Sequence, residues 1–326
     1  MKFKTYFVLR GDNEHLARGE LKALLEITTG SFEVKCYPML CLSTATTEEA
    51  VEVVKRSGYV KEAGVLLRVF DLYSPSDARE VGELLGGVAH VSVYKSPASD
   101  EAIRAFLERA GVRIGVKGVG EKRLLITTGT AVAGIKVAVQ NTKEMLERSR
   151  TRPFKRSIAL TPDIARALVN LSRARRGSVL VDPFAGTGAV LVEAWSMGIR
   201  GVAVELDYEL AKGMKLNFEF FAANAIPIIG DSRYVVFREV DHVATDLPYG
   251  RGASTHGIEL KLLYRDFLER LSEYLSKKGF ACFMTPLWME DYVDELVDQA
   301  GLRLIERYYD YVHSSLTRVI SVVVKK

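Results

Sequence analysis

A short acidic and aromatic motif, Asp246-Leu247-Pro248-Tyr249, follows His242–Thr245 (HVAT), an apolar run that we expect to be a strand. The Asp246 carboxylate and a backbone carbonyl at Leu247, held rigid by Pro248, can accept hydrogen bonds from both N–H groups of an exocyclic amine. Such an amine is a poor nucleophile because its lone pair is delocalised into the ring. Tyr249 offers a face for base stacking, which contributes about 1–3 kcal/mol in single-strand sites. The motif therefore predicts an acceptor site for in-line methyl transfer to a nucleobase amine.

A glycine-rich loop, Asp182–Gly188 (DPFAGTG), stands between an expected strand and an expected helix. Glycines let the backbone approach a ligand, and a helix N-terminus presents free N–H groups. The loop is neither a GxxxxGK[ST] phosphate loop nor a complete GxGxxG. An acid ahead of the glycines suits a cationic ligand without phosphate, such as S-adenosylmethionine. The expected cofactor contacts from this loop and the acceptor motif are Asp182, Phe184, Gly186, Gly188 and Asp246.

Three further residues complete the predicted cofactor site. Glu205 ends the next expected strand, 17 residues after Gly188, where an acid can accept both ribose hydroxyls. Asp231 closes a third strand and can accept from an adenine amino group, although a surface acid in a turn is the alternative. Thr161 begins the helix ahead of the first strand, where we expect it to be the N-cap.

The second half of the chain alternates short β-rich runs with helical patterns, which predicts a doubly wound parallel sheet. The expected strands are Ser178–Val181, Gly201–Glu205, Ile226–Ile229, His242–Thr245 and Gly279–Met284, followed by a hairpin of Arg303–Val312 and Arg318–Val324. A helix carrying Leu260 to Leu275 is expected to end at Lys277-Lys278-Gly279. We thus predict a Rossmann-like, seven-stranded α/β domain that binds its ligand beyond the carboxyl ends of its strands.

The first 140 residues predict an α+β region in two small lobes. Strands are expected at Phe3–Arg10, Leu66–Leu72 and Leu124–Thr128, and helices at Glu14–Leu25, Thr47–Ser57, Ser76–Leu85 and Asp100–Ala110. The expected organisation is an N-terminal region over residues 1–145, a basic linker over 146–160 and the α/β domain over 161–326.

Positive charge is concentrated around the expected linker. Lys143 to Arg176 contains ten basic and three acidic residues, a local net charge of +7, whereas the whole chain carries +4. A solvated linker and helix face explains such a run, and a polyanionic partner is the competing interpretation.

Length and composition exclude several other classes. The 326 residues, 48 % of them hydrophobic, suit two globular domains. Without a signal peptide or an apolar stretch of membrane-spanning length, a cytoplasmic protein with no membrane partner is expected. Cys36, Cys41 and Cys282 have no paired CxxC spacing, so we expect buried thiols, no disulfide and no metal site.

Longer segments resemble the archaeal tRNA guanosine-10 N2-methyltransferases that carry a THUMP domain. The similar segments are Arg152–Arg156 (RPFKR), Ala159–Leu171 (ALTPDIARALVNL) and His313–Arg318 (HSSLTR), which together with the motifs above cover most of residues 150 to 320. The resemblance implies a THUMP domain with a ferredoxin-like lobe before residue 145, S-adenosylmethionine as donor and tRNA as partner. Some relatives also use a small zinc-binding activator subunit. The basic run then supplies phosphate contacts, for which the candidates are Arg152, Lys155, Arg156, Arg173, Arg175 and Arg176.

The resemblance also implies that guanosine 10 is flipped into the site beside Tyr249. Leu247 departs from the proline that many amino-methyltransferases carry there, which loosens the inference about which amine is methylated. Two alternatives stay open, an adenine N6-methyltransferase acting on RNA or DNA and a non-catalytic RNA-binding protein.

Overall fold

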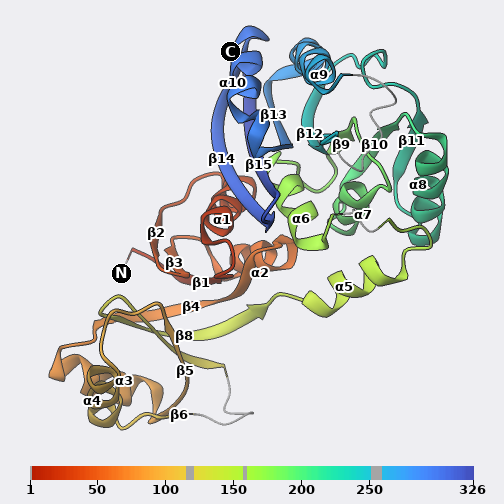
Figure 1. Cartoon of the computed structure of the whole chain (residues 1–326). Coiled ribbons are helices and arrows are strands. Elements are labelled where there is room, and N and C mark those ends of the chain that lie inside the picture. The colour runs from red at the N-terminus through yellow and green to blue at the C-terminus, as the bar shows by residue number, and fades with distance from the viewer. Residues whose placement is uncertain (1, 115–120, 157–159, 251–258) are drawn as a thin grey trace. The chain divides into compact units, whose positions relative to one another are not determined.

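The chain folds into two compact units, described here from a computed structural model (Figure 1). The structure describes residues 2–114, 121–156, 160–250 and 259–326. The N-terminal unit comprises Met1–Asn141 and the C-terminal unit Thr142–Lys326. The division lies just ahead of helix α5 (Thr142–Thr151), so the predicted boundary at residue 145 falls within that helix. Ala159, part of the family-like segment, lies outside the described residues.

The C-terminal unit is built on one seven-stranded sheet in the order β11-β10-β9-β12-β13-β15-β14. Its strands are β9 (Val179–Asp182), β10 (Arg200–Glu205), β11 (Ala225–Ile229), β12 (Val240–Asp246), β13 (Leu275–Pro286), β14 (Leu302–His313) and β15 (Leu316–Lys325). β9 to β13 pair in parallel, whereas β15 pairs antiparallel with both β13 and β14. The predicted seven strands and the C-terminal hairpin are confirmed. β9, β10 and β12 therefore end at one edge, as a ligand site requires.

Helices connect these strands and cover the sheet. They are α5, α6 (Pro162–Leu171), α7 (Ala189–Ser196), α8 (Tyr208–Phe221), α9 (Leu260–Tyr274) and α10 (Glu290–Gln299), with a 3-10 turn at Leu287–Met289. Apolar residues of α9 and α10 share one core with β12 and β13, and α6 packs against α7. The expected end of α9 at Lys278 is wrong, because Leu275 already pairs with Val240 as a strand residue. The sequence did not reveal α10.

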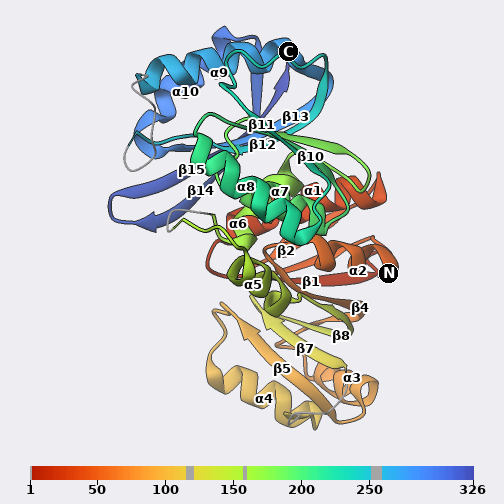
Figure 2. The same cartoon turned by 90° about the vertical axis from the view of Figure 1, so that its right-hand side faces the viewer.

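The N-terminal unit has a single eight-stranded sheet in the order β2-β3-β1-β4-β8-β7-β5-β6. Its elements are β1 (Thr5–Leu9), α1 (Glu14–Thr29), β2 (Val34–Tyr37), β3 (Leu40–Ser43), α2 (Thr47–Arg56), β4 (Val60–Asp71), α3 (Pro75–Leu85), β5 (Val88–Tyr94), α4 (Asp100–Ala110), β6 (Arg113–Ile114), β7 (Lys122–Thr127) and β8 (Thr130–Val139). Figure 2 shows α3 and α4 near one end of β4 and β8, away from α1 and α2. Separate apolar cores around Phe106 and around Tyr6 correspond to the two predicted lobes. The four predicted helices are confirmed, whereas β2, β3, β5, β6 and β8 were not predicted.

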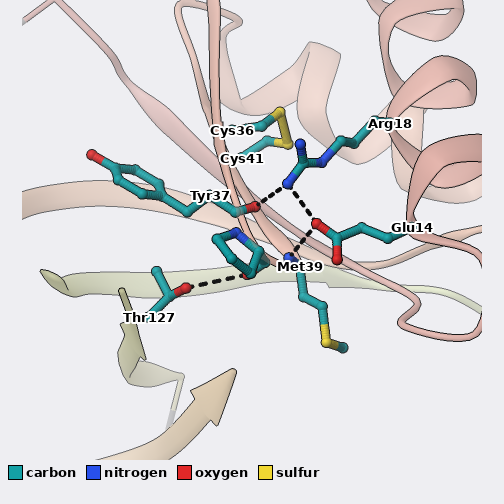
Figure 3. Close-up of a disulfide and its surroundings, with 8 residues drawn as sticks. Glu14, Arg18, Cys36, Tyr37, Met39, Cys41 and Thr127 are labelled. Carbon is teal, nitrogen blue, oxygen red and sulfur yellow. Dashed lines mark hydrogen bonds and ion pairs between the residues drawn. A yellow bond between two sulfur atoms is a disulfide. The ribbon is translucent and has the colours of Figure 1, made fainter. Parts of the chain in front are cut away.

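The prediction about the cysteines is wrong for two of the three. Cys36 and Cys41 form a disulfide across the β2–β3 hairpin, where they are directly opposed (Figure 3). Opposed residues of an antiparallel pair lie close enough for this bond, although the sequence spacing is not CxxC. Arg18 donates to the Tyr37 carbonyl at 3.0 Å, which ties the same hairpin to α1. Cys282 is a buried free thiol, as expected.

No helix in the described ranges is long and apolar enough to cross a membrane.

Candidate active site

A cleft of ≈ 1210 Å³ opens at the carboxyl edge of the C-terminal sheet. It brings together predicted site residues from Thr161 to Tyr249, because successive parallel strands end side by side. Its lining includes ten of the predicted site residues and the phosphate-contact candidate Arg156. These ten are Thr161, Asp182, Phe184, Gly186, Glu205, Asp231, Asp246, Leu247, Pro248 and Tyr249.

The glycine loop shapes one wall of the cleft. Gly186 has a φ of 53°, and a Cβ at this position would meet no protein atom within 4 Å, so the loop leaves open space beside its backbone. Gly188, predicted as a cofactor contact, does not line the cleft. Its φ is 79°, and a Cβ there would lie 2.7 Å from the Phe218 ring, so backbone conformation and packing against α8 explain this glycine.

Glu205 is anchored at the end of β10 by two backbone amides. Gly186 N donates to its Oε2 at 2.7 Å, and Asp207 N donates to its Oε1 at 2.8 Å. Burial raises the pKa of the Glu205 carboxyl above its ordinary value, although these hydrogen bonds act in the opposite direction. Each carboxylate oxygen keeps a second lone pair, so Glu205 can still accept hydrogen bonds from a ligand in the cleft.

Asp182 forms the floor of the cleft, with only 1 % of its surface exposed. Thr245 Oγ1 donates to its Oδ1 at 2.7 Å, and Phe184 N donates to the same oxygen at 3.2 Å. Burial raises the pKa of Asp182 to about 7. A positive charge placed in the cleft would therefore stabilise its ionised form.

The acceptor motif begins at Asp246, the last residue of β12, and lines the same cleft as Asp182. Tyr249 Oη donates to Asp246 Oδ1, and Tyr264 Oη donates to the Pro248 carbonyl at 2.7 Å. The Leu247 side chain is 2 % exposed and belongs to the apolar core, so this residue reaches the cleft through its backbone. Burial raises the pKa of Asp246 to about 6, which leaves its carboxyl largely ionised at neutral pH.

Asp231 lines the cleft but already holds an ion pair. Arg233 Nη2 donates to Asp231 Oδ2 at 2.6 Å, and Arg233 Nε donates to Oδ1 at 3.0 Å. Burial alone would raise the pKa of Asp231, yet the bonds from Arg233 lower it. The carboxylate is thereby held ionised at the rim of the cleft.

Two of the six predicted phosphate contacts are buried, which corrects that expectation. Arg152 is 6 % exposed, and burial lowers the pKa of its guanidinium. Arg173 is 7 % exposed, forms an ion pair with Glu306 and lies 5.0 Å from the Phe280 ring centroid. Neither side chain presents its charge to a nucleic-acid backbone.

The other four predicted phosphate contacts are exposed but do not form one patch. Lys155 and Arg156 precede α6, and Arg156 lines the cleft. Arg175 and Arg176 follow α6 and precede β9, at the amino edge of the sheet. The helix thus separates the basic run into a part beside the cleft and a part at the other edge.

Several cleft residues were not predicted as site residues. Arg318 comes from β15 and lines the cleft together with the acceptor motif, as do Trp288 and His313. Arg318 and His313 belong to the segment HSSLTR, whose family resemblance was the signal that could have identified them. Within the described residues, no group of three or more His, Cys, Asp or Glu side chains could hold a metal ion.

Comparison with known proteins agrees with this geometry. Residues 149–231 and 229–319 match the family described as RMKL-like, methyltransferase domain. The tRNA (guanine(10)-N2)-dimethyltransferase of Methanothermobacter thermautotrophicus is 31 % identical over 85 % of this chain and 77 % of that protein. The protein of the same name from Pyrococcus abyssi is 29 % identical over 96 % of this chain and 97 % of that protein.

Solved structures share the fold of the whole chain. The crystal structure of TrmN from Thermus thermophilus gives a TM-score of 0.57 at 20 % identity, covering 99 % of this chain and 100 % of TrmN. SMU.472, solved as a complex with SAH, gives a TM-score of 0.52 at 11 % identity, covering 100 % and 99 % of the two chains. Sequence and fold together place the chain in the family of tRNA (guanine(10)-N2)-dimethyltransferases.

Proposed function

We propose that this protein transfers methyl groups from S-adenosylmethionine to the exocyclic N2 of guanosine 10 in tRNA. The observation that carries the proposal is the position of Asp246-Leu247-Pro248-Tyr249 in the same cleft as the glycine loop and Glu205. A cofactor in that cleft and an amine at Asp246 would be neighbours, as an in-line transfer requires. Relatives bearing the name dimethyltransferase support the transfer of two methyl groups.

The cleft fits S-adenosylmethionine by shape and by charge. Gly186 leaves open space at the loop, and Glu205 can accept from ribose hydroxyls. Asp231 is positioned at the end of β11 to accept from an adenine amino group. The acids of the lining suit a ligand that carries a sulfonium and an ammonium, and a phosphate ligand would be repelled by them.

The bound cofactor supplies an electrophilic methyl carbon. Asp246 accepts one N–H of the guanine amine and the Leu247 carbonyl accepts the other, which aims the nitrogen lone pair at that carbon. Tyr249 donates to Oδ1 of Asp246, so the amine can be accepted by Oδ2 or by the second lone pair of Oδ1. After transfer, the nitrogen loses a proton to relieve its positive charge, and Asp246 is placed to take it, with a pKa near 6.

Guanosine in a paired region must leave its stack to reach Asp246, so we propose that the nucleotide is flipped into the cleft. Lys155 and Arg156 are exposed at or beside the cleft, where they can contact phosphates. The N-terminal unit is proposed to contain the THUMP domain and the adjoining ferredoxin-like lobe that bind tRNA. A tRNA substrate implies a cytoplasmic location.

A small zinc-binding activator subunit is a further part of the proposal. The sheet of the C-terminal unit offers it one surface, the edge strand β11, which carries exposed Ile226 (61 %) and Ile229 (57 %). An unpaired strand edge with apolar side chains is a template for strand addition by a partner.

The test is methyl transfer from labelled S-adenosylmethionine to an unmodified tRNA transcript, followed by nucleoside analysis. We expect N2-methylguanosine and N2,N2-dimethylguanosine, and no label in a transcript with guanosine 10 replaced. Labelled N6-methyladenosine would overturn the substrate and support the adenine N6-methyltransferase. Cofactor binding without transfer, both with and without a candidate activator subunit, would favour a non-catalytic RNA-binding protein.

A further inference from the structure

We propose that Arg318 donates a hydrogen bond to O6 of the target guanine and so selects guanine among bases that carry a 2-amino group. This inference rests on the proposed function and names the residue that reads the base. Bases that carry a 2-amino group are not distinguished by the acceptor motif, which binds the amine, or by the glycine loop, which binds the cofactor.

The register of the sheet brings Arg318 to the acceptor motif. Asp246 of β12 pairs with Met284 of β13, and Pro286, two residues further along β13, pairs with Arg318 of β15. Only β13 separates the two strands, so their backbones lie roughly 10 Å apart. An arginine side chain is long enough to act across such a gap, and the lining of the cleft contains both residues.

The guanidinium of Arg318 is held in place but retains donors. Its Nη1 donates to Asp310 Oδ2 at 3.2 Å, and 15 % of the side chain is exposed. Within the described part of the chain this is its one hydrogen bond, and the buried Nε has no partner. Arginine has five N–H donors and no acceptor, so the Nη groups can still bind an acceptor atom in the cleft.

Charge relations agree with the position of Arg318 in the same cleft lining as Asp246. Its guanidinium lowers the pKa of Asp246, although burial of that carboxyl has the larger and opposite effect. It acts in the same direction on the pKa of Tyr249. Asp310, on the other side of Arg318, raises the pKa of Asp246. Arg318 is therefore paired with Asp310 and lies near enough to Asp246 to affect the charge of that carboxyl.

The chemistry of guanine fits this arrangement. Its 2-amino group, N1–H and O6 follow one another along a single edge, as donor, donor and acceptor. With Asp246 and the Leu247 carbonyl accepting from the 2-amino group, O6 enters the cleft as an acceptor that needs a donor. Arg318 is a cationic donor in the same lining as the acceptor motif, and a base without O6 would give its remaining N–H donors no acceptor.

The test compares two tRNA transcripts, one with guanosine and one with 2-aminopurine at position 10, in single-turnover methyl transfer. 2-Aminopurine keeps the 2-amino group and lacks both O6 and N1–H. We expect the wild-type protein to prefer guanosine, and Arg318→Met to lower kcat/KM for guanosine by roughly 5- to 150-fold, the range of a good arginine–guanine contact. The rate on 2-aminopurine should change little, so the preference for guanosine falls. Because arginine has no acceptor and cannot bind N1–H, the coupling between Arg318 and the base change reports the contact with O6.

Matched variants separate recognition from charge and folding. Arg318→Lys keeps the charge and should restore part of the preference, and Arg303→Met removes an exposed arginine of β14 and should leave both rates unchanged. Equal losses on both transcripts in Arg318→Met would overturn the proposal and indicate a phosphate contact or a structural role. Wild-type protein that leaves guanosine 10 unlabelled would refute the proposed function itself, and this inference with it.

Discussion

The sequence indicated two sets of charged residues, the acids of the cleft and the basic run Lys143 to Arg176. The two sets differ in how the fold arranges them in space. The acids of the cleft, spread from Asp182 to Asp246, converge on one cavity. The ten basic residues are close in sequence but dispersed in space. Arg148, Arg166 and Arg173 form buried ion pairs, Arg156 lines the cleft, and Arg175 and Arg176 lie at the amino edge of the sheet. Proximity in sequence was therefore a poor guide to proximity in space, whereas position relative to a strand end was a good one.

The reason lies in the two kinds of secondary structure. A parallel sheet brings the carboxyl ends of its strands to one edge, so residues just after β9, β10 and β12 must meet. A helix instead distributes neighbouring residues around its axis, so some face the core and others face solvent. Arg148 of α5 and Arg166 of α6 point inward and meet Glu193 of α7, which is 3 % exposed.

The largest expected effect comes from replacing the acceptor carboxylate by an amide. Asp246→Asn should lower the rate of methyl transfer at least 100-fold, because the amide cannot accept in the same way or take a proton. Cofactor binding, measured by calorimetry, should change little. Full transfer activity in this variant would contradict the assignment of Asp246 as the acceptor carboxylate.

The matched change in the basic cluster should affect stability instead. Glu193→Gln leaves Arg148 and Arg166 without their shared carboxylate, to which they donate at 3.0 and 2.7 Å. We expect the free energy of unfolding to fall by about 3–5 kcal/mol, the cost of breaking a buried pair. Urea unfolding would measure this. A decrease in the free energy of unfolding of less than about 1 kcal/mol would contradict the role of Glu193 in holding α5, α6 and α7 together.

The pH dependence of transfer gives a third test of the cleft. Burial raises the pKa of Asp246 to about 6, and only its ionised form accepts the amine. Below that pKa, kcat/KM for tRNA should therefore fall about tenfold per pH unit, and well above it the profile should be flat. The measurement uses single-turnover transfer with a pH-matched check of tRNA binding. A profile that is flat through this region would contradict the assignment.

The smallest expected effect is on the salt dependence of tRNA binding, which should differ between exposed and buried arginines of the basic run. Arg156→Ala should weaken tRNA binding and reduce the slope of log Kd against log salt by about 1. Arg173→Ala should leave that slope unchanged and lower the melting temperature, because it removes the ion pair with Glu306. Filter binding at several salt concentrations measures the slope. An unchanged slope in the first variant, or a reduced one in the second, would reverse the distinction drawn here.

The sequence by itself determined the sheet of the C-terminal unit and most of its cleft. Strand ends marked by Asp182, Glu205 and Asp246 follow from local patterns of apolar runs, glycines and acids, and local patterns are visible without a fold. The same holds for the four helices of the N-terminal unit. Family resemblance added the substrate, which no single motif specified.

Tertiary structure alone decided which side chains meet across distant elements. Pairing of β2 with β3 opposed Cys36 to Cys41, and the antiparallel β15 carried Arg318 to the acceptor motif. Packing against α8 explained Gly188, and burial beside Glu193 or Glu306 removed arginines from the surface. These outcomes depend on the order of the strands and on which face of each helix is covered. Burial of apolar surface across the whole chain decides the order and the covered faces, and residues adjacent in sequence do not.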